Sequence, residues 1–435
     1  MKWSQFIFSF DSSTNKLLFN TRNNSTVLIP EDEYTYINNL IKTDSINSSV
    51  PSNIKSDIES LIDMNFILDN NFNEKDEFLN HIHNSNIQSK KLDLVILTTS
   101  SCNFKCSYCY ENGISRKNSL CESDIFDILN LLEQYILKFK LETINLCLFG
   151  GEPTLNWEFS KKLLKNIHML CLKNNILLKT EIISNGYLLN NDKIRFLEKY
   201  NFTNAQITLD GTKDIHDSRR MLLNGDGSFN KIIKNLHTLL KSNIETVTLR
   251  LNYDKNNVDN IENLLEFLRD EFCEYLDKIN LSFGLIDSNE INESDNILNN
   301  NNEIYNSYLA LFKKSLDLGF TVPPIFKLGS LCMSKRDNSI IISADKKLYK
   351  CLSFVGLESV SQGNLYSDVN SIKNYLNLDL YKSCFEKKCE FIPICHQGCR
   401  FKSLINTGSP YNQICNYELL RNINKECLEL SYNLK

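Results

Sequence analysis

Three cysteines stand close together in the run Cys102-Asn-Phe-Lys-Cys106-Ser-Tyr-Cys109. Three thiolates at this spacing on one loop can hold three corners of a cubic [4Fe–4S] cluster and leave the fourth iron open to bind something else. Ordinary ferredoxins ligate all four irons and use a tighter first spacing. Structural zinc takes a closed set of four ligands, often with two residues between paired cysteines. The spacing therefore favours a cluster with one open iron.

Glycine-containing motifs follow at the ends of later apolar runs. Gly150-Gly151-Glu152-Pro153 comes directly after the apolar run that ends at Phe149. Glycine lets the backbone approach a ligand closely because no Cβ intervenes. Ser184-Asn185-Gly186 and Leu209-Asp210-Gly211 close two further runs, and Arg219-Arg220 follows the second. Asn-Gly is also a common turn dipeptide, so a plain turn at Asn185 is the alternative to a binding role.

From Leu92 onward, apolar strands alternate with amphipathic helices, which predicts a parallel sheet and a partial (β/α)6 TIM-like barrel of the α/β class. In such barrels the chemistry lies at the carboxyl ends of the strands, and the three-cysteine run falls there. The expected strands are 94–98, 144–149, 181–184, 206–209, 247–252 and 280–285. The expected helices are 123–138, 157–173, 192–200, 229–242 and 258–272.

Two smaller domains flank the expected barrel. The first 90 residues contain no cysteine and predict a small α+β domain, with strands at 16–20, 25–30 and 66–68 and helices from Pro30 and over 54–64. The segment 70–77 is polar and acidic and is interpreted as a linker. The tail is cysteine-dense and turn-rich from Leu331. We expect domains at 1–90, 91–315 and 316–435.

Composition excludes several classes of function. The net charge is -5 and no basic block is present, so binding driven by nucleic-acid phosphates is not expected. Nothing approaches 18 consecutive apolar residues, so no transmembrane helix is predicted. No signal peptide is recognised at the N-terminus, which favours a cytoplasmic protein. Fifteen cysteines without an export signal then favour metal or cluster ligation over disulfides.

The cysteine run and the glycine motif together resemble the signature of the radical S-adenosylmethionine (SAM) enzymes. The resemblance implies that SAM chelates the open iron and that Tyr108 lies against adenine. It implies that Gly150, Gly151, Glu152 and Pro153 hold the SAM amino group, and that Ser184 and Asn185 contact the ribose. Arg250, at the end of the fifth strand, either reaches the SAM carboxylate or pairs with a neighbouring carboxylate. Asp210 either contacts the substrate as a catalytic residue or caps a turn.

The tail resembles the SPASM domain, which binds two auxiliary [4Fe–4S] clusters. Two features depart from that pattern: the first central gap is four residues instead of two, and Lys346 stands where a glycine is usual. Carried over, one cluster takes Cys384, Cys389, Cys395 and Cys415, and the other takes Cys332, Cys351 and Cys399. A pair of zinc knuckles is the alternative.

Three clusters with one open SAM site need eleven thiolates, and the matching positions provide ten. The stretch 323–329, where some relatives carry a further cysteine, has none. We therefore expect an auxiliary cluster with an open or non-cysteine fourth position. Cys121, Cys147, Cys171 and Cys273 are interpreted as structural. Cys427 is also interpreted as structural, but among these five cysteines it is the better candidate for the missing cluster ligand because it follows the tail.

The resemblance suggests two peptide-modifying functions. One is a maturase that forms a thioether in a ribosomally made, cysteine-containing precursor peptide, with the N-terminal domain gripping its leader or serving as a structural cap. The other resembles the anaerobic sulfatase maturases, which make formylglycine. Those enzymes place an aspartate where this chain has Leu352, which favours the thioether maturase. Both functions need a low-potential electron donor such as flavodoxin or ferredoxin. A third hypothesis is that the protein is a non-catalytic iron–sulfur electron carrier.

Overall fold

The computed structural model describes residues 1–44, 50–87, 89–109, 117–286, 301–321 and 331–432. The chain divides into two compact units. The first unit comprises Met1–Ser85, Pro324–Cys332 and Tyr375–Lys435, and the second comprises Asn86–Pro323 and Met333–Asn374.

The second unit is built on a sheet in which six parallel strands are paired in chain order. The predicted partial barrel is thus confirmed. These strands are β6 (Lys91–Leu97), β7 (Thr143–Phe149), β8 (Leu177–Ser184), β9 (Phe202–Leu209), β10 (Thr246–Tyr253) and β11 (Ile279–Leu285). The helices between and after them are α4 (Asp124–Phe139), α5 (Trp157–Lys173), α6 (Asn191–Glu198), α7 (Lys213–Arg219), α8 (Phe229–Leu240), α9 (Val258–Glu271) and α10 (Asn301–Asp317). Short 3-10 turns lie at η1 (Pro153–Asn156) and η2 (Cys273–Lys278).

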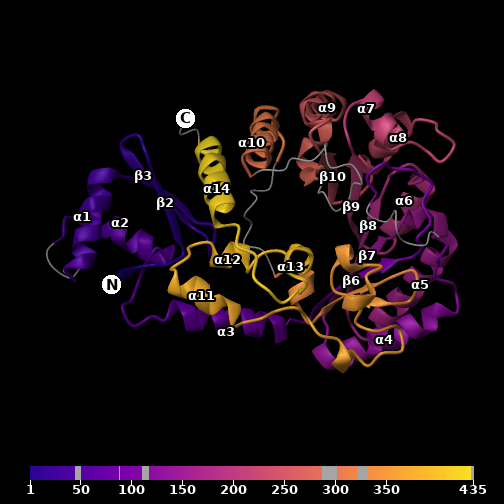
Figure 1. The fold of residues 1–435 in the computed structure, drawn as a ribbon, viewed down its shortest axis with the longest axis horizontal. Coiled ribbons are helices and arrows are strands. Elements are labelled where there is room, and N and C mark those ends of the chain that lie inside the picture. The colour runs from indigo at the N-terminus through magenta and orange to yellow at the C-terminus, as the bar shows by residue number, and fades with distance from the viewer. Residues whose placement is uncertain (45–49, 88, 110–116, 287–300, 322–330, 433–435) are drawn as a thin grey trace. The chain divides into compact units, whose positions relative to one another are not determined.

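Side-chain periodicity decides which face of each element is buried. In β8 every second residue is buried, from Leu178 through Ile182 to Ser184. In α8 the buried residues fall three and four positions apart, as in Phe229, Ile232 and Leu236. Figure 1 shows the helices α4 to α9 on the outer side of the strands. The apolar side chains therefore fill the layer between sheet and helices, and the other face of the strands turns toward the barrel interior.

A hairpin from the expected tail domain joins the same sheet. Strand β12 (Ser339–Ile342) pairs in parallel with β6, and β13 (Leu348–Tyr349) pairs antiparallel with β12. All six of these residues are buried. The chain contacts therefore place 333–374 with the barrel, which differs from the boundary expected at residue 316. The 3-10 turns of this part are η5 (Met333–Lys335), η6 (Leu352–Phe354), η7 (Glu358–Val360) and η8 (Val369–Ser371).

The first unit contains the predicted small sheet. Its antiparallel strands are β2 (Ile7–Ser12), β3 (Asn15–Asn20) and β4 (Thr26–Pro30), beside helices α1 (Glu31–Lys42) and α2 (Ser52–Asp63) and the pair β1 (Lys2–Trp3) and β5 (Ile67–Leu68). Strand β2 was not among the predicted strands. The expected linker 70–77 instead runs into helix α3 (Glu74–Ile87), whose Phe78 and Ile82 are buried.

The C-terminal segment packs into this same unit. Its helices are α11 (Leu380–Glu386), α12 (Ile392–Cys395), α13 (Arg400–Thr407) and α14 (Tyr417–Ser431). The ring centroids of Phe8 and Phe391 lie 5.1 Å apart, and those of Phe78 and Tyr381 lie 5.4 Å apart. The segments expected as a first and a third domain thus share hydrophobic clusters. Aromatic burial joins them because each alone would leave an apolar face exposed.

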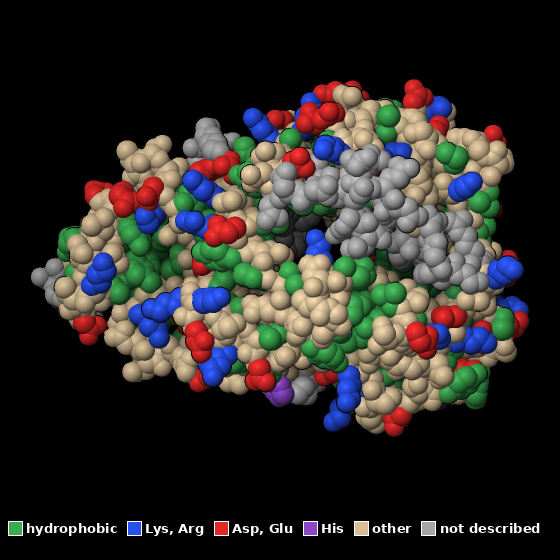
Figure 2. Space-filling view, in the orientation of Figure 1, with side chains coloured by type: hydrophobic (Ala, Val, Ile, Leu, Met, Phe, Trp, Pro, Cys, Tyr) green, Lys and Arg blue, Asp and Glu red, His purple; other side chains and the backbone are tan. Residues whose placement is uncertain are grey.

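Charges of both signs are mixed on the face of the molecule that Figure 2 draws. On the face drawn in Figure 2, the Lys and Arg side chains are interspersed with Asp and Glu among the described residues. No helix within the described ranges is both long and apolar enough to cross a bilayer.

Candidate functional site

The three-cysteine run lies on the loop that leaves the carboxyl end of β6. The backbone N–H of Phe104 donates to Cys102 Sγ (3.4 Å), and Asn185 Nδ2 lies 3.9 Å from the same sulfur. Burial raises the pKa of the Cys102 thiol to about 12. A thiol in this position ionises readily only when a metal takes the place of its proton. The donor set and the N–H···S contacts thus fit an iron–sulfur cluster.

A second segment runs antiparallel beside this loop. Lys105 N donates to Met221 O (2.9 Å), Ser107 N to Arg219 O (3.3 Å) and Leu223 N to Asn103 O (3.0 Å). The end of α7 and the residues after it therefore hold the cysteine loop in place through backbone hydrogen bonds. Sequence reasoning noted Arg219 and Arg220 but did not predict this pairing, because nothing local in either segment marks it.

Gly150 and Gly151 let the end of β7 pack directly on the cysteine loop. A Cβ at Gly150 would lie 2.3 Å from Thr99 O, and one at Gly151 would lie 2.4 Å from Ser101 O. Gly151 N donates to Thr99 O, and Glu152 N donates to Ser101 O, both at 2.9 Å. Because both glycines lack a Cβ, the end of β7 can lie in direct backbone contact with the residues that lead into the cysteine loop.

Glu152 is fully buried and its carboxylate is surrounded by donors. Oε1 accepts from Thr154 N (3.1 Å), Thr154 Oγ1 (2.5 Å) and Ser184 Oγ (2.9 Å), and Oε2 accepts from Asn185 N (2.8 Å). Burial raises the pKa of Glu152, and these hydrogen bonds oppose that rise. The carboxylate thus joins the ends of β7 and β8. Pro153 is buried and opens η1 directly after it.

Ser184 and Asn185, at the end of β8, connect the Glu152 carboxylate to the cysteine run. Ser184 Oγ donates to Glu152, while Asn185 Nδ2 donates to Asn103 Oδ1 in the cysteine run (2.8 Å). Asn185 is therefore in the immediate surroundings of the cysteine loop. Gly186 adopts a φ of +78°, as the turn alternative at this motif requires.

Tyr108 and Asp210 are brought together by the two arginines. Tyr108 Oη accepts from Arg220 Nη1 (2.7 Å), which lies 3.8 Å from Asp210 Oδ1. Arg219 Nε donates to Asp210 Oδ2 (3.4 Å), and Arg219 Nη2 donates to Asp254 Oδ2 (2.8 Å). Burial raises the pKa of Asp210, although both guanidiniums oppose the rise. Asp210 Oδ1 and Arg220 Nε are buried without a hydrogen-bond partner among the described residues.

His216 and Asp217 hold this group in place. His216 Nδ1 faces Asp210 N (3.4 Å), His216 Nε2 lies 3.1 Å from Ser228 Oγ, and Ser228 Oγ donates to Arg220 O (2.8 Å). These contacts fit a neutral ring protonated at Nε2, and burial lowers the pKa of His216 to about 3. Asp217 Oδ1 accepts from the backbone N–H groups of Ser228 (2.7 Å) and Phe229 (2.8 Å) and so caps α8.

Arg250 points into the barrel from β10. Its Nε donates to Asn252 Oδ1 (3.1 Å) and its Nη1 donates to Ser282 Oγ (3.0 Å). A Cβ at Gly284 would lie 2.3 Å from Arg250 Nε, so the glycine of β11 makes room for the guanidinium. Asn252 Nδ2 also donates to Tyr108 Oη (3.2 Å). Arg250 is thereby joined through Asn252 to the cysteine run.

Four of the tail cysteines line one cavity in the first unit. Cys384, Cys389, Cys395 and Cys415 share its wall with apolar side chains such as Phe391 and Leu420. Gln413 Nε2 donates to Cys384 Sγ (3.0 Å), and burial raises the pKa of Cys389 to about 12. No group of three His, Cys, Asp or Glu side chains in the described ranges is arranged to hold a single metal ion. Four thiols around an apolar space fit a cluster with its own sulfides.

The other tail cysteines are distributed between the units. Cys332 and Cys399 belong to the first unit, where burial lowers the pKa of Arg400 and both cysteines oppose that change. Cys351 belongs to the second unit. Cys427 is buried on α14 and is not part of the cavity lining. The stretch 323–329, which lacks the eleventh cysteine, lies outside the described residues.

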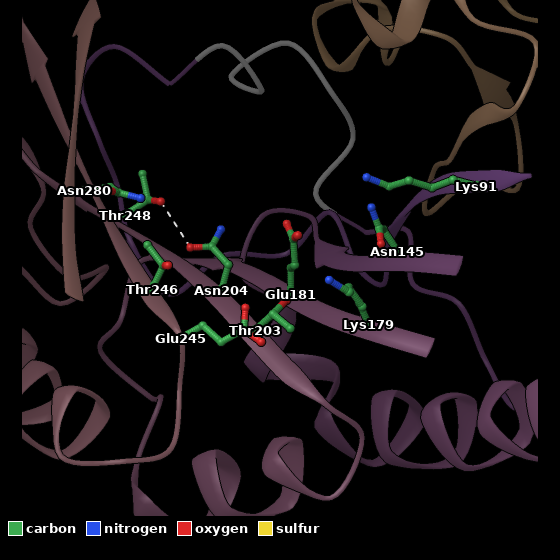
Figure 3. Close-up of a pocket in the computed structure, with 10 residues that line it drawn as sticks. All are labelled: Lys91, Asn145, Lys179, Glu181, Thr203, Asn204, Glu245, Thr246, Thr248 and Asn280. Carbon is green, nitrogen blue, oxygen red and sulfur yellow. Dashed lines mark hydrogen bonds between the residues drawn. The ribbon is translucent and has the colours of Figure 1, made fainter. Parts of the chain in front are cut away.

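A separate polar hollow of about 310 Å³ lies at the amino ends of the barrel strands. Figure 3 shows Lys91 and Asn145 on one side, Thr248 and Asn280 on the other, and Glu181 between them. Thr248 Oγ1 donates to Asn204 Oδ1 (3.1 Å) within it. None of the predicted site residues lines this hollow, because the motifs lie at the opposite, carboxyl ends of the strands.

Comparison with known proteins identifies the barrel. Residues 96–268 match the model of the Radical SAM superfamily. The chain is 28% identical over 335 residues to a cysteine-type anaerobic sulfatase-maturating enzyme of Clostridium novyi, covering 72% of this chain and 88% of that protein. It is 23% identical over 312 residues to the radical SAM cyclopropyl synthase TigE of Paramaledivibacter caminithermalis, covering 67% of this chain and 59% of that protein.

Two solved structures share the fold. Native anSMEcpe with bound AdoMet matches with a TM-score of 0.61 at 19% identity, over 79% of this chain and 100% of the other. SuiB of Streptococcus suis bound to S-adenosylmethionine matches with a TM-score of 0.54 at 17% identity, over 96% of this chain and 99% of the other. The segment 96–268 therefore matches the radical SAM superfamily, and a [4Fe–4S] cluster and SAM are the cofactors that this superfamily implies.

Proposed function

We propose that this enzyme matures a ribosomally made precursor peptide by joining a cysteine sulfur to a carbon of another residue. The observation that carries the proposal is the extent of the likeness to SuiB, which covers 96% of this chain. A structure of SuiB is described as bound to precursor peptide SuiA. The anSMEcpe match covers 79% of the chain. A full-length match to a precursor-binding enzyme supports a precursor as the substrate here.

The N-terminal sheet offers a means of holding a leader. Its strand order β2-β3-β4 makes β2 and β4 the outer strands. An extended leader can add to such an outer strand through backbone hydrogen bonds. The central strand β3 pairs with both outer strands, and its Leu17, Leu18 and Phe19 are buried. We assign leader binding to this sheet.

In the barrel, the chain's own residues position the reaction. Cys102, Cys106 and Cys109 would hold the SAM-binding cluster, which together with SAM supplies a 5′-deoxyadenosyl radical that removes a substrate hydrogen atom. Gly150 and Gly151 allow the end of β7 to pack against the start of the cysteine loop, and Glu152 joins the ends of β7 and β8. Arg250 is a cation directed into the interior, where a carboxylate could pair with it. Asp210 is assigned as a polar contact for the substrate.

The tail is assigned to two auxiliary clusters. Thioether formation removes two hydrogens from the substrate: one leaves as a hydrogen atom, and the other leaves as a proton and an electron. A redox group of the enzyme must accept that electron. The cavity with four cysteines supports one fully ligated cluster. The second cluster, which the resemblance to the SPASM domain implies, would offer a free position for the substrate thiolate.

Formylglycine formation is the second candidate. The 28% identity to a sulfatase-maturating enzyme, over 88% of that protein, favours it. Leu352 occupies the place where the resemblance expects an aspartate base, and it lies in the turn η6. An apolar side chain there cannot take up the proton that this reaction releases.

One experiment separates these functions. The anaerobically reconstituted enzyme is incubated with SAM, a reductant and a cysteine-containing leader peptide encoded by a neighbouring short reading frame, and the product is analysed by mass spectrometry. A thioether gives a peptide that has lost two hydrogens and is not alkylated by iodoacetamide. An aldehyde that reacts with a hydrazide would instead support formylglycine. Cleavage of SAM without any change in the peptide would overturn both assignments for that peptide.

A further inference from the structure

Arg220 is a buried cation in contact with the cysteine run. Its side chain is 10% exposed, and its Nη1 donates to Tyr108 Oη at 2.7 Å. The guanidinium carbon lies 5.8 Å from the ring centroid of Phe104. Phe104 stands between the first two cysteines and Tyr108 between the last two. One charged group therefore rests on side chains from both halves of the loop.

The backbone of Arg220 is fixed as firmly as its side chain. Its N–H donates to His216 O and its carbonyl accepts from Ser228 Oγ, both at 2.8 Å. Its neighbours on either side pair with the cysteine loop, through Arg219 O and Met221 O. The position of the guanidinium is therefore set by the fold and not by a flexible surface chain.

The charge of Arg220 is less completely neutralised than that of Arg219. Arg219 makes a two-point contact with Asp254, at 2.8 and 3.4 Å, and also reaches Asp210 at 3.4 Å. Arg220 is 3.8 Å from Asp210, which it shares with Arg219, and its Nε has no hydrogen-bond partner in the described ranges. Of the two guanidiniums, the one on the cysteine side is thus the less closely paired with a carboxylate.

We propose that Arg220 is a positioning residue that raises the reduction potential of the cluster held by Cys102, Cys106 and Cys109. A cluster with three thiolates is an anion, and reduction adds one more negative charge. The potential of such a cluster depends on nearby charge and on its exposure to water. A fixed cation in a buried site interacts strongly with added charge because little water screens it.

The same charge acts on the groups around it. Burial works to lower the pKa of Arg220, but Tyr108, Cys106 and Asp210 raise it well above its usual value. Arg220 in turn opposes the rise in the pKa of Cys102 that burial causes. The inference rests on the radical SAM assignment and does not depend on which peptide is modified.

The test compares Arg220→Gln with Lys105→Gln in the full-length reconstituted protein. Both changes remove one positive charge near the cysteine run, but Lys105 is exposed to solvent. Redox titration is followed by electron paramagnetic resonance without peptide, and the signal that changes on addition of SAM identifies this cluster. We expect Arg220→Gln to lower the reduced-to-oxidised ratio at a fixed potential about tenfold, which is about 59 mV for one electron. Lys105→Gln should leave it unchanged because water and salt screen that charge.

Equal potentials in Arg220→Gln and the wild type, at matched iron and sulfide content, would overturn the proposal. Arg220→Lys keeps the charge and should recover most of the wild-type potential. If Arg220→Gln fails to retain the cluster, Asp210→Asn decides, because removing the carboxylate beside Arg220 should raise the potential. A fall or no change in that variant would equally overturn the proposal. None of these readings uses peptide product, so they stand apart from the proposed function.

Discussion

Asn185 joins two motifs that are 82 positions apart in the sequence: its Nδ2 donates to Asn103 Oδ1, inside the cysteine run, at 2.8 Å. The backbone N–H of the same residue donates to Glu152 Oε2, also at 2.8 Å. The ends of β6, β7 and β8 are thus tied by one asparagine and one glutamate. Glu152 is therefore a support for the site, because its oxygens are occupied by protein donors.

The first prediction concerns this support. Glu152→Gln replaces one acceptor oxygen by an NH₂ group that faces existing donors, which should disturb the ends of β7 and β8. Loss of a partner in such a supporting shell typically lowers affinity roughly 10–100-fold. We expect SAM affinity to fall by this order, measured by equilibrium dialysis of the reconstituted protein. Ser184→Ala, which removes one donor to the same carboxylate, should cause a smaller loss, and equal affinities in all three proteins would contradict the interpretation.

The second prediction concerns Cys106. Cys106→Ala removes one of three thiolates for the SAM-binding cluster, so formation of 5′-deoxyadenosine should fall to background. Iron and sulfide should fall by the content of one cluster, while the auxiliary clusters remain. Product is measured by chromatography and iron by colorimetric assay. Cys273→Ala, at an exposed cysteine outside the predicted sets, is the matched control and should retain both.

The third prediction concerns the union of the N-terminal and C-terminal segments. Phe391 is fully buried against Phe8, whereas Phe126 on α4 is 69% exposed. Truncation of a buried Phe to Ala typically costs about 3–5 kcal/mol, and most surface changes cost about 0.5 kcal/mol or less. Phe391→Ala should therefore lower the thermal transition of the first unit far more than Phe126→Ala lowers that of the second unit, which contains α4.

Deletion of residues 1–85 extends this comparison. The deletion would expose Phe391 and Tyr381, which pack against the N-terminal segment. We expect the shortened protein to lose iron from the tail cavity as well as the N-terminal sheet. Full retention of auxiliary iron, with an unchanged thermal transition, would show instead that the tail folds without that segment.

The fourth prediction concerns Lys346, which has a φ of +68° where the resemblance expects glycine. A side chain in this conformation costs roughly 1–2 kcal/mol. Lys346 Nζ also pairs with Asp124 Oδ1 at 2.7 Å, and a partly exposed pair contributes about 1 kcal/mol or less. Lys346→Gly relieves the strain and loses the pair, whereas Lys346→Ala only loses the pair. The Gly variant should thus melt above the Ala variant, and the reverse order would contradict a strained backbone.

The fifth prediction concerns pH. Burial lowers the pKa of His216 to about 3, below its value in the unfolded chain. Between about 6.5 and 3 the unfolded state therefore binds more protons, so His216 destabilises the fold progressively as pH falls, by at most about 1.4 kcal/mol per unit. His216→Asn retains an acceptor for Asp210 N without titrating. Its melting temperature should depend less on pH between 7 and 5 than that of the wild type.

Local sequence was sufficient for the barrel and for the position of its motifs. Alternating strands and helices predicted the parallel sheet, and the motifs lie at its carboxyl ends because each directly follows an apolar strand. The expected N-terminal sheet was found in part, although β2 and α3 were missed. Helix α3 was missed because its polar, acidic start is typical of a linker. Its buried Phe78 packs against Tyr381 and Phe385, which are about 300 positions later in the sequence.

The residues by themselves determined which chemistry the chain can hold, because thiolate spacing and glycine placement are written in short local runs. Only the tertiary structure decided which side chains are free to act. It placed Arg220 against Tyr108, enclosed Glu152 among protein donors, and gathered Cys384 and Cys415 around one cavity. The physical reason is that burial and pairing depend on contacts between segments distant in sequence, and no local pattern records them.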